Sequence, residues 1–427
     1  MDLEQIPYLE LVLGFTVIVY FCHSYLELRQ YKALCLKSPP KSVASLFKDE
    51  EYEKAKSYSL DKWWFGMVKG VYDVIESLAM LGFGFLPFAW DLSSKLVSRI
   101  GFWTDSEIFV TLVFVFGFSM LSMVMELPWS LYGTFVLEEK HGFNKQTKGV
   151  FFGDRVKQIL IGLLLGPPII GAVVYILNNS GPYLPIYLWG FMFALGIFLM
   201  TIYPVCIAPL FNKFEPLEEG SLRDGIETLA ASLKFPLTRL YQMDGSKRSA
   251  HSNAFMYGFF NNKRIVLFDT LIEQCNEKQV VAVLAHELGH WKLSHTVKMF
   301  VGSQIIVFVQ FLLFAYIRNS NALMASFGFV DTQPAFVALI LYQLISSPMD
   351  EVVSFGSNIV SRMFEFQADE FAVNLGHSEK LSEALVIMQK ENKGALNVDK
   401  WYSAYHYSHP PLPERLEAIT TNSKKTK

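Results

Sequence analysis

The stretch VAVLAHELGHWKLSH, residues 281–295, is the one around which the rest of the sequence is organised. It contains His286, Glu287 and His290 in the order His-Glu-x-x-His. Residues four apart on an α-helix lie on one face about one turn apart, so the two imidazoles can bind one metal ion. The pattern favours zinc, because neutral imidazole is a preferred zinc ligand and a catalytic zinc site combines three protein ligands with one water. Glu287 is then free to act as a general base.

The residues before this motif are typical of a buried helix. Residues 279–285, QVVAVLA, lack Gly and Pro and are mostly apolar. Gly289 lies inside the predicted helix, where glycine costs about 1 kcal/mol relative to alanine, so we expect another segment to pack closely against that turn. The alternative is an ordinary helix with two hydrogen-bonded histidines. The chain has 9 histidines among 427 residues, so chance would produce the motif on the order of once in a hundred such sequences.

The composition is that of a membrane protein. Hydrophobic residues make up 52% of the chain and charged residues only 18%. The formal net charge of -3 gives no reason to expect a nucleic-acid partner. The four cysteines are far apart in sequence and form no C-x-x-C pair, so we interpret them as unpaired thiols in a reducing compartment. We expect the bilayer as a partner and a monomeric chain.

Apolar stretches predict about seven membrane spans. They lie near residues 8–21, 63–90, 108–127, 159–177, 186–211, 300–317 and 335–345. The last stretch is short for a bilayer, which needs about 20 residues, so we expect the span to continue through Ser354 or beyond. Residues 29–62 are interpreted as an exposed loop, because basic residues are interspersed with acidic ones there and Pro39-Pro40 breaks a helix. Asp73 and Glu76 within the second span hint at a hydrated interior.

The distribution of basic residues predicts how the chain is oriented. They are dense after the first, third and fifth spans and sparse after the second, fourth and sixth. The positive-inside rule then predicts a lumenal N-terminus, with the metal motif and the C-terminus in the cytosol. We divide the chain into residues 1–211 with five spans, 212–298 as a polar α/β insert that carries the motif helix, 299–355 with two spans, and 356–427 as a C-terminal helical region.

Two predicted strands precede the motif helix. Residues 253–260 and 264–268 alternate like strands and are joined at Asn261-Asn262-Lys263, a plausible hairpin. The edge of such a hairpin beside the helix could bind an extended substrate by β-augmentation. A structural hairpin without a ligand is an equal alternative.

The third metal ligand must come from elsewhere, and the best candidate stretch is SRMFEFQAD, residues 361–369. Glu365 and Asp369 are four apart, so both carboxylates lie on one face of a predicted helix. Glu365 could bind the zinc while Asp369 accepts a hydrogen bond from a ligand imidazole and so fixes its tautomer. A solvated acidic helix face is the alternative. His295, five residues after His290, is expected to point off the ligand face.

Taken together, these segments resemble the type I CAAX prenyl endopeptidases, which are integral-membrane zinc metalloproteases of the endoplasmic reticulum. The resemblance covers nearly the whole chain, and the motifs that carry it are HELGH, SRMFEFQAD, SNAFMYG at residues 252–258, and YSHPPLPERL at residues 407–416. It implies a mainly α fold: a bundle of about seven membrane spans that encloses a hydrated chamber, with a cytosolic zincin-like α/β insert that carries the motif helix.

The resemblance also implies site residues and a substrate. It assigns one zinc ion to His286, His290 and Glu365, the base to Glu287, and support of a ligand imidazole to Asp369. It places Asn253 and Ala254 on a substrate-binding edge strand and His409 near the reacting carbonyl, together with Arg415, which would bind substrate. The implied substrate is a C-terminal CaaX peptide whose cysteine carries an isoprenoid, and the last three residues are removed. A farnesyl tail prefers hydrocarbon while the peptide bond needs a hydrated metal, so the site must be reachable from both.

Some of these roles have alternatives in the residues themselves. His409 precedes Pro410-Pro411, where a lone histidine is more often structural than a hydrogen-bond donor to an oxyanion. Arg362 and Arg415 are expected to hold helices together or to orient Glu365 and other carboxylates. The final residues, KKTK, resemble a dilysine retrieval signal of endoplasmic reticulum membrane proteins, although short basic tails also occur by chance.

Two other functions are compatible with the motif. One is a membrane quality-control zinc protease that cuts misfolded membrane proteins. The other is a non-enzymic membrane scaffold with a degenerate metal site, against which the intact Glu287 argues.

Overall fold

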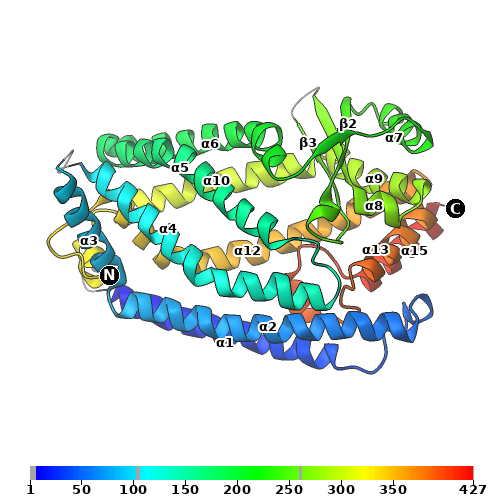
Figure 1. The fold of residues 1–427 in the computed structure, drawn as a ribbon, viewed down its shortest axis with the longest axis horizontal. Helices are drawn as coiled ribbons and strands as arrows, with labels where there is room; N and C mark the ends of the chain where they lie inside the picture. The colour runs from blue at the N-terminus through cyan, green and yellow to red at the C-terminus, as the bar shows by residue number, and fades with distance from the viewer. Residues whose placement is uncertain (1–5, 102–105, 259–261, 427) are drawn as a thin grey trace.

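Long helices run side by side between the two ends of an elongated molecule (Figure 1). The computed structural model describes residues 6–101, 106–258 and 262–426. The long helices are α1 (Tyr8–Leu34), α2 (Asp49–Gly82), α4 (Glu107–Tyr132), α5 (Lys148–Asn179), α6 (Leu184–Ile202), α10 (His295–Ile317) and α12 (Ala335–Asn374). After a bend of 63°, α2 continues into α3 (Phe85–Ile100). Six helices are long and apolar enough to cross a membrane, or seven with this bent pair, which confirms the predicted number of spans.

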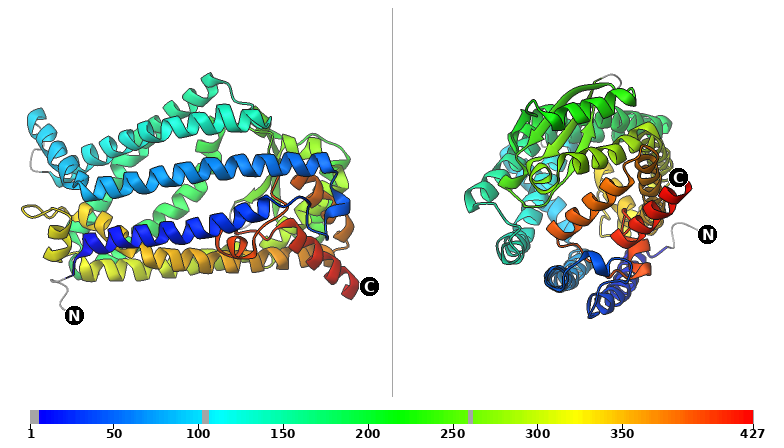
Figure 2. Two further views of the ribbon diagram at one scale, coloured as in Figure 1. Left: turned by 90° about the horizontal axis from the view of Figure 1, so that it is seen from below. Right: turned by 90° about the vertical axis from the view of Figure 1, so that its right-hand side faces the viewer.

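The remaining elements gather mainly at one end of the bundle. They are β1 (Phe214–Pro216), α7 (Ser221–Ser232), β2 (Leu237–Met243), β3 (Ala254–Tyr257), β4 (Lys263–Phe268), α8 (Asp269–Gln274), α9 (Glu277–Lys292), α13 (Ser378–Glu391), α14 (Lys400–His406) and α15 (Leu412–Thr426). The short helix α11 (Asn321–Ser326) lies at the opposite end, as does α3 (Figure 1). The first helix, α1, begins at that opposite end, whereas the last helix, α15, lies at the end that carries the sheet (Figure 2).

A four-stranded sheet in the order β1-β2-β4-β3 forms part of the insert. The pair β2 and β4 is parallel, whereas β1 with β2 and β3 with β4 are antiparallel. The predicted hairpin is confirmed by the pairing of Ala254 with Leu267 and of Tyr257 with Arg264. Residues 259–261, which comprise the end of the first predicted strand and Asn261 of the predicted turn, lie outside the described residues. Since β3 pairs only with β4, it is an edge strand of this sheet.

The two larger hydrophobic cores lie at opposite ends of the bundle. The insert core surrounds α9 and includes Ile226, Leu240, Leu267, Val280, Leu284 and Leu381. The distal core includes Tyr8, Trp90, Phe114, Leu177, Phe314 and Leu341. Between them the described helices bury almost nothing: no residue is buried in 152–172 of α5, 296–313 of α10 or 347–363 of α12. The spans are therefore packed at their ends and loosely covered in the middle.

The helix α12 connects the two cores. It has 40 residues, so it is about 60 Å long, twice the thickness of the hydrocarbon layer of a membrane. Its first turns bury Leu341 in the distal core, and its last turns bury Phe364 and Ala372 at the insert end. The short span predicted at 335–345 does continue past Ser354, and the same helix carries Glu365.

The prediction of an exposed loop at residues 29–62 is wrong. Only residues 35–48 lie between helices, because α1 continues to Leu34 and α2 begins at Asp49. The charges that suggested a loop instead form the start of α2: Glu51 accepts a hydrogen bond from the backbone of Lys48 at 2.8 Å, and acidic residues fill the first turn. Acidic groups at a helix N-terminus stabilise it through the helix dipole.

Candidate metal centre

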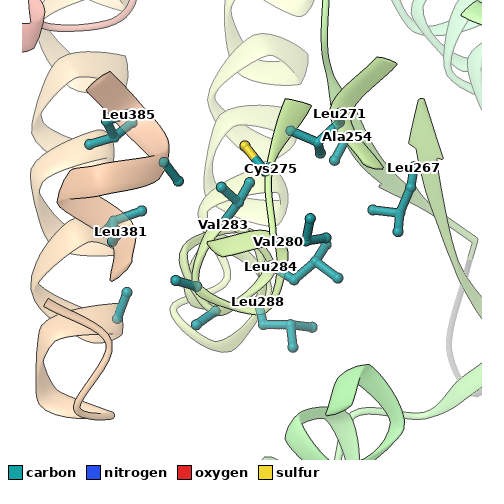
Figure 3. Close-up of a cluster of buried hydrophobic side chains, with 14 of the residues drawn as sticks. Ala254, Leu267, Leu271, Cys275, Val280, Val283, Leu284, Leu288, Leu381 and Leu385 are labelled. Atoms are coloured by element: carbon teal, nitrogen blue, oxygen red, sulfur yellow. The ribbon is translucent and has the colours of Figure 1, made fainter. Parts of the chain in front are cut away.

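The helix α9 is held in place on almost every side. Its N-terminus is capped by Asn276, whose side chain accepts a hydrogen bond from Gln279 N at 3.1 Å, and Gln279 Oε1 accepts one in return from Asn276 N at 2.9 Å. Figure 3 shows Leu381 of α13 on one side of the helix and Leu267 of the sheet on the other. Nine of its residues are buried, which agrees with the prediction of a buried helix and leaves the motif little freedom to move.

The structure brings the three predicted ligands together. His286 Nε2 lies 3.3 Å from His290 Nε2, and Glu365 offers one oxygen at 3.5 Å from His286 Nε2 and the other at 3.3 Å from His290 Nε2. One donor atom of each residue lies within 4.8 Å of the other two. Two nitrogens and a carboxylate converging in this way are the donor set of a catalytic zinc site.

The Glu365 carboxylate fits a metal in a second respect. Its Oε2 atom is buried and, although Arg415 Nη1 lies 3.7 Å away, it has no hydrogen-bond partner among the described residues. A buried carboxylate oxygen without a hydrogen bond is costly. A cation between the two imidazoles and this oxygen would remove that cost. The residues present therefore fit a bound metal ion.

Gly289 explains how α12 comes close enough to supply the third ligand. A Cβ atom at this position would lie 3.2 Å from Ala368 Cα and 3.1 Å from Phe371 Cδ1, closer than ordinary van der Waals contact. Glycine thus lets the backbone of α12 approach α9 one turn after Glu365. The close packing expected at this turn from the sequence is confirmed.

The outer nitrogen of His286 is held by a buried ion pair. Asp369 Oδ1 lies 2.8 Å from His286 Nδ1, and Arg415 donates to both oxygens of Asp369 at 2.9 and 2.6 Å. Burial by itself would lower the pKa of His286, but the carboxylates of Asp369 and Glu365 beside it raise the pKa to about 9. Because Nδ1 faces a carboxylate, the ring turns Nε2 toward the centre.

The outer nitrogen of His290 is held by a residue that the sequence did not suggest. His295 Nδ1 lies 3.0 Å from His290 Nδ1. The expectation that His295 points off the ligand face is wrong, since it assumed that one helix continues through both residues. Ser294, with a φ of 57°, lies between the end of α9 at Lys292 and the start of α10 at His295, and the change of chain direction there turns the ring back. The only feature of the sequence that pointed to this contact was a histidine shortly after the motif helix.

Glu287 and His409 lie beside the ligands without taking part in the buried ion pair. Glu287 is half-buried, and its carboxylate makes no hydrogen bond within the described part of the chain. His409 comes from the loop between α14 and α15; its Nε2 lies 3.3 Å from Glu365 Oε1, and its side chain is 65% exposed. Both side chains are therefore accessible to a substrate at the centre.

The remaining predicted site residues lie farther out. Asn253 is exposed at the start of the edge strand and caps Ala254 N with its own side chain at 2.8 Å. Arg362 contacts no ligand: it donates to Ser403 O at 3.0 Å and to Glu414 at 2.7 Å. Arg362 thus holds α14 and α15 against α12, which agrees with the expectation that it holds helices together.

Residues far from the motif support the edge strand. His251, three residues before Ala254, stacks on Phe143 with ring centroids 4.1 Å apart, and its Nδ1 lies 3.0 Å from Asn392 Oδ1. Its other nitrogen lies 3.7 Å from Glu138, at the end of the π-helical segment Gly133–Glu138 that follows α4. No sequence pattern suggested this contact, which couples the strand to the membrane helices.

Known proteins are similar to this chain along nearly its whole length. Residues 30–213 match the family model of the CAAX prenyl protease N-terminal region, described as five membrane helices, and residues 216–423 match that of peptidase family M48. The chain is 53% identical to CAAX prenyl protease 1 homolog of Arabidopsis thaliana, covering 99% of each chain, and 42% identical to that of Homo sapiens, covering 96% and 94%. The crystal structure of S. mikatae Ste24p is similar with a TM-score of 0.91 and 37% identity, covering 97% of this chain and 99% of that one.

The spans and the site together define a multi-pass membrane metallopeptidase. With full-length relatives at this level of identity, the chain belongs to the CAAX prenyl protease 1 group of peptidase family M48. The resemblance inferred from the sequence motifs is confirmed.

Proposed function

We propose that this protein is a zinc-dependent endopeptidase that removes the last three residues from C-terminally isoprenylated CaaX proteins. The observation that carries the proposal is the convergence of His286, His290 and Glu365 within 4.8 Å, with Glu287 beside them on α9. The names of the full-length relatives, CAAX prenyl protease 1 homologs, support the substrate class.

The residues around the centre divide the chemistry among them. A zinc ion held by His286, His290 and Glu365 would polarise the scissile carbonyl and lower the pKa of a water molecule toward about 7. Glu287 accepts the proton of the attacking water and passes it to the leaving amine. His409, exposed at the edge of the centre, donates a hydrogen bond to the oxygen of the reacting carbonyl, where negative charge develops.

The buried partners of the ligands hold their side chains in place. Asp369 holds His286, and Arg415 neutralises Asp369. Arg415 is 12% exposed, donates to both oxygens of Asp369 and lies 3.7 Å from Glu365, so we infer that it positions these carboxylates rather than touching substrate. Arg362 holds the C-terminal helices against α12.

We infer that the substrate peptide adds to the free edge of β3, with Asn253 and Ala254 contacting its backbone. The loosely covered middle of the bundle supports a hydrated chamber beside it. Charged groups meet there: Lys69 Nζ lies 2.9 Å from Asp73 and 3.3 Å from Glu126, a pairing between α2 and α4 that needs a polar environment. An isoprenoid can stay in hydrocarbon while its peptide reaches the metal.

We further infer placement in the endoplasmic reticulum membrane as a monomer, with a lumenal N-terminus and the centre and C-terminus in the cytosol. The distribution of basic residues supports this orientation. The four segments 1–211, 212–298, 299–355 and 356–427 are proposed as functional rather than independently folding parts, because α10 and α12 run across two of the boundaries.

The decisive experiment uses the purified full-length protein with a farnesylated CaaX peptide and the same peptide without the lipid. We expect one zinc per chain by elemental analysis, and cleavage of the lipidated peptide only. Glu365→Ala should lose zinc and cleavage together, whereas Glu287→Ala should keep zinc and lose cleavage. Equal cleavage of both peptides, or of unrelated membrane proteins, would favour a quality-control protease. Activity that survives Glu287→Ala would contradict the assigned base.

A further inference from the structure

The two ligand imidazoles are supported by different kinds of partner. His286 Nδ1 faces the Asp369 carboxylate at 2.8 Å. His290 Nδ1 faces a second imidazole nitrogen, Nδ1 of His295, at 3.0 Å, and His295 Nε2 in turn lies 2.9 Å from Gln367 Oε1. His290 is thus the first member of a three-residue chain, His290-His295-Gln367, that ends on α12.

Only one arrangement of protons satisfies this chain. An imidazole that binds a metal through Nε2 is neutral and carries its proton on Nδ1. His290 Nδ1 is then a donor, so His295 Nδ1 must be the acceptor and the proton of His295 must lie on Nε2. Gln367 must present its oxygen to that proton, and the structure has Oε1 at this position. The tautomer of each ring is therefore set by the next residue along the chain.

The middle ring of the chain is also fixed in space. His295 is 2% exposed and stacks on Phe364, with ring centroids 4.0 Å apart and an angle of 2° between the planes. Phe364 precedes the ligand Glu365, and Gln367 follows it by one further residue on the same helix. Hence α12 contributes one ligand directly and holds a second ligand through His295.

We propose that His295, oriented by Gln367, is a positioning residue that fixes the tautomer and ring orientation of His290 for metal binding. The proposal rests on the metal centre described above and adds a residue to it. Partners of this kind are worth about 10- to 100-fold in metal affinity in other sites. His295 itself touches neither the metal nor the substrate.

Two substitutions at His295 separate this role from simple packing. The side-chain amide of Asn reaches the place of Nδ1, so His295→Asn keeps an acceptor for His290 but loses Gln367. Gln reaches the place of Nε2, so His295→Gln keeps Gln367 but leaves His290 without its partner. We expect His295→Gln to lower zinc affinity about 10- to 100-fold and His295→Asn to lower it several-fold less. Affinity is measured on the full-length protein by competition with a chelator.

A second pair of variants tests the end of the chain. Gln367→Glu keeps an oxygen acceptor for His295, whereas Gln367→Met keeps the length and removes the acceptor. Gln367→Met should weaken zinc binding more than Gln367→Glu. Phe364→Leu, which removes the ring under His295 without changing its polar contacts, reports the loss due to packing alone. Thermal unfolding in excess chelator shows whether each variant is folded before metal is added.

The outcomes distinguish the two proposals. Equal losses of affinity for His295→Asn and His295→Gln, or wild-type affinity in His295→Gln, would overturn the positioning role. A wild-type protein that binds zinc but spares prenylated peptide would refute the proposed substrate and leave the affinity series valid. A wild-type protein that binds no metal would overturn both.

Discussion

The two ends of the bundle are packed by different kinds of side chain. The insert end buries four ionisable residues, none more than 5% exposed: His286, His295, Glu365 and Asp369. The distal core is built from apolar residues such as Phe314 and Leu341, both fully buried, and the described residues around it bury no charged group. Two helices, α10 and α12, contribute buried residues to both ends.

This difference has a physical consequence for how each end responds to change. Apolar packing is non-directional, so a core of this kind tolerates substitutions of similar volume. Buried charges need particular partners, because removing one leaves the other uncompensated in a medium of low polarity. The stability of the insert end should therefore depend on individual polar contacts. The stability of the distal end should depend mainly on the volume that its side chains fill.

The largest effect is expected at Asp369. Asp369→Asn removes the charge opposite Arg415, which is 12% exposed, and should lower the free energy of unfolding by about 3 kcal/mol or more. Zinc affinity should fall at least about tenfold, since His286 loses its anionic partner. Thermal unfolding and chelator competition measure the two effects. Glu414→Gln, which breaks the half-exposed pair with Arg362, is the matched control and should cost no more than about 1 kcal/mol.

A distal substitution should affect stability alone. Leu341 is 0% exposed in the distal core, and Leu341→Ala should lower the free energy of unfolding by about 2–5 kcal/mol through the cavity that it leaves. Zinc affinity, measured in the same preparation, should not change. A large loss of affinity in this variant would show that α12 couples the two ends and would break the comparison.

A smaller effect is expected where α9 meets α12. Gly289→Ala places a methyl group 3.2 Å from Ala368 Cα, so one helix must shift by a few tenths of an ångström, at a cost of about 1–3 kcal/mol. Because Glu365 lies on the displaced helix, the rate of peptide cleavage should fall by more than the loss of folded protein explains. Gly302→Ala, in α10 where an added Cβ meets nothing within 4 Å, is the control. Equal activity of the two variants would contradict the close-contact role.

The smallest effect concerns acid sensitivity at the insert end. Burial, reinforced by the charge of nearby His23, lowers the pKa of His406 in α14 to about 4, and its Nε2 has no partner among the described residues. A folded-state pKa below the usual 6.5 means that His406 contributes stability above pH 6.5 that is lost as the pH falls toward 4. His406→Phe should reduce the fall in Tm between pH 6.5 and 4.5 by about 1 °C or more. An unchanged pH profile would contradict this assignment.

Some of the centre could be predicted because it depends on local spacing. His286 and His290, and likewise Glu365 and Asp369, are pairs four apart on one helix, and helix geometry alone places each pair on one face. The apolar spans are also readable, since hydrocarbon requires long uncharged helices. These features belong to single elements, so they can be predicted without knowing how the elements pack.

Other features could not be predicted because they depend on more than one element. The charged residues in 49–62 suggested a loop, yet they form the first part of α2, which extends beyond the membrane span. His295 was excluded by helical spacing, but a single left-handed residue, Ser294, reverses the chain before it. The contact of His251 with Phe143 joins segments more than a hundred residues apart.

The sequence by itself determined which residue types meet on α9, the matching pair of carboxylates near the C-terminus, and the number of apolar spans. Only the tertiary structure decided that Glu365 reaches the imidazoles, that Arg415 is buried against Asp369, and that His295 turns back to His290. The reason is that backbone geometry sets distances within a helix, whereas distances between helices depend on packing, on glycines such as Gly289, and on the turns that join them.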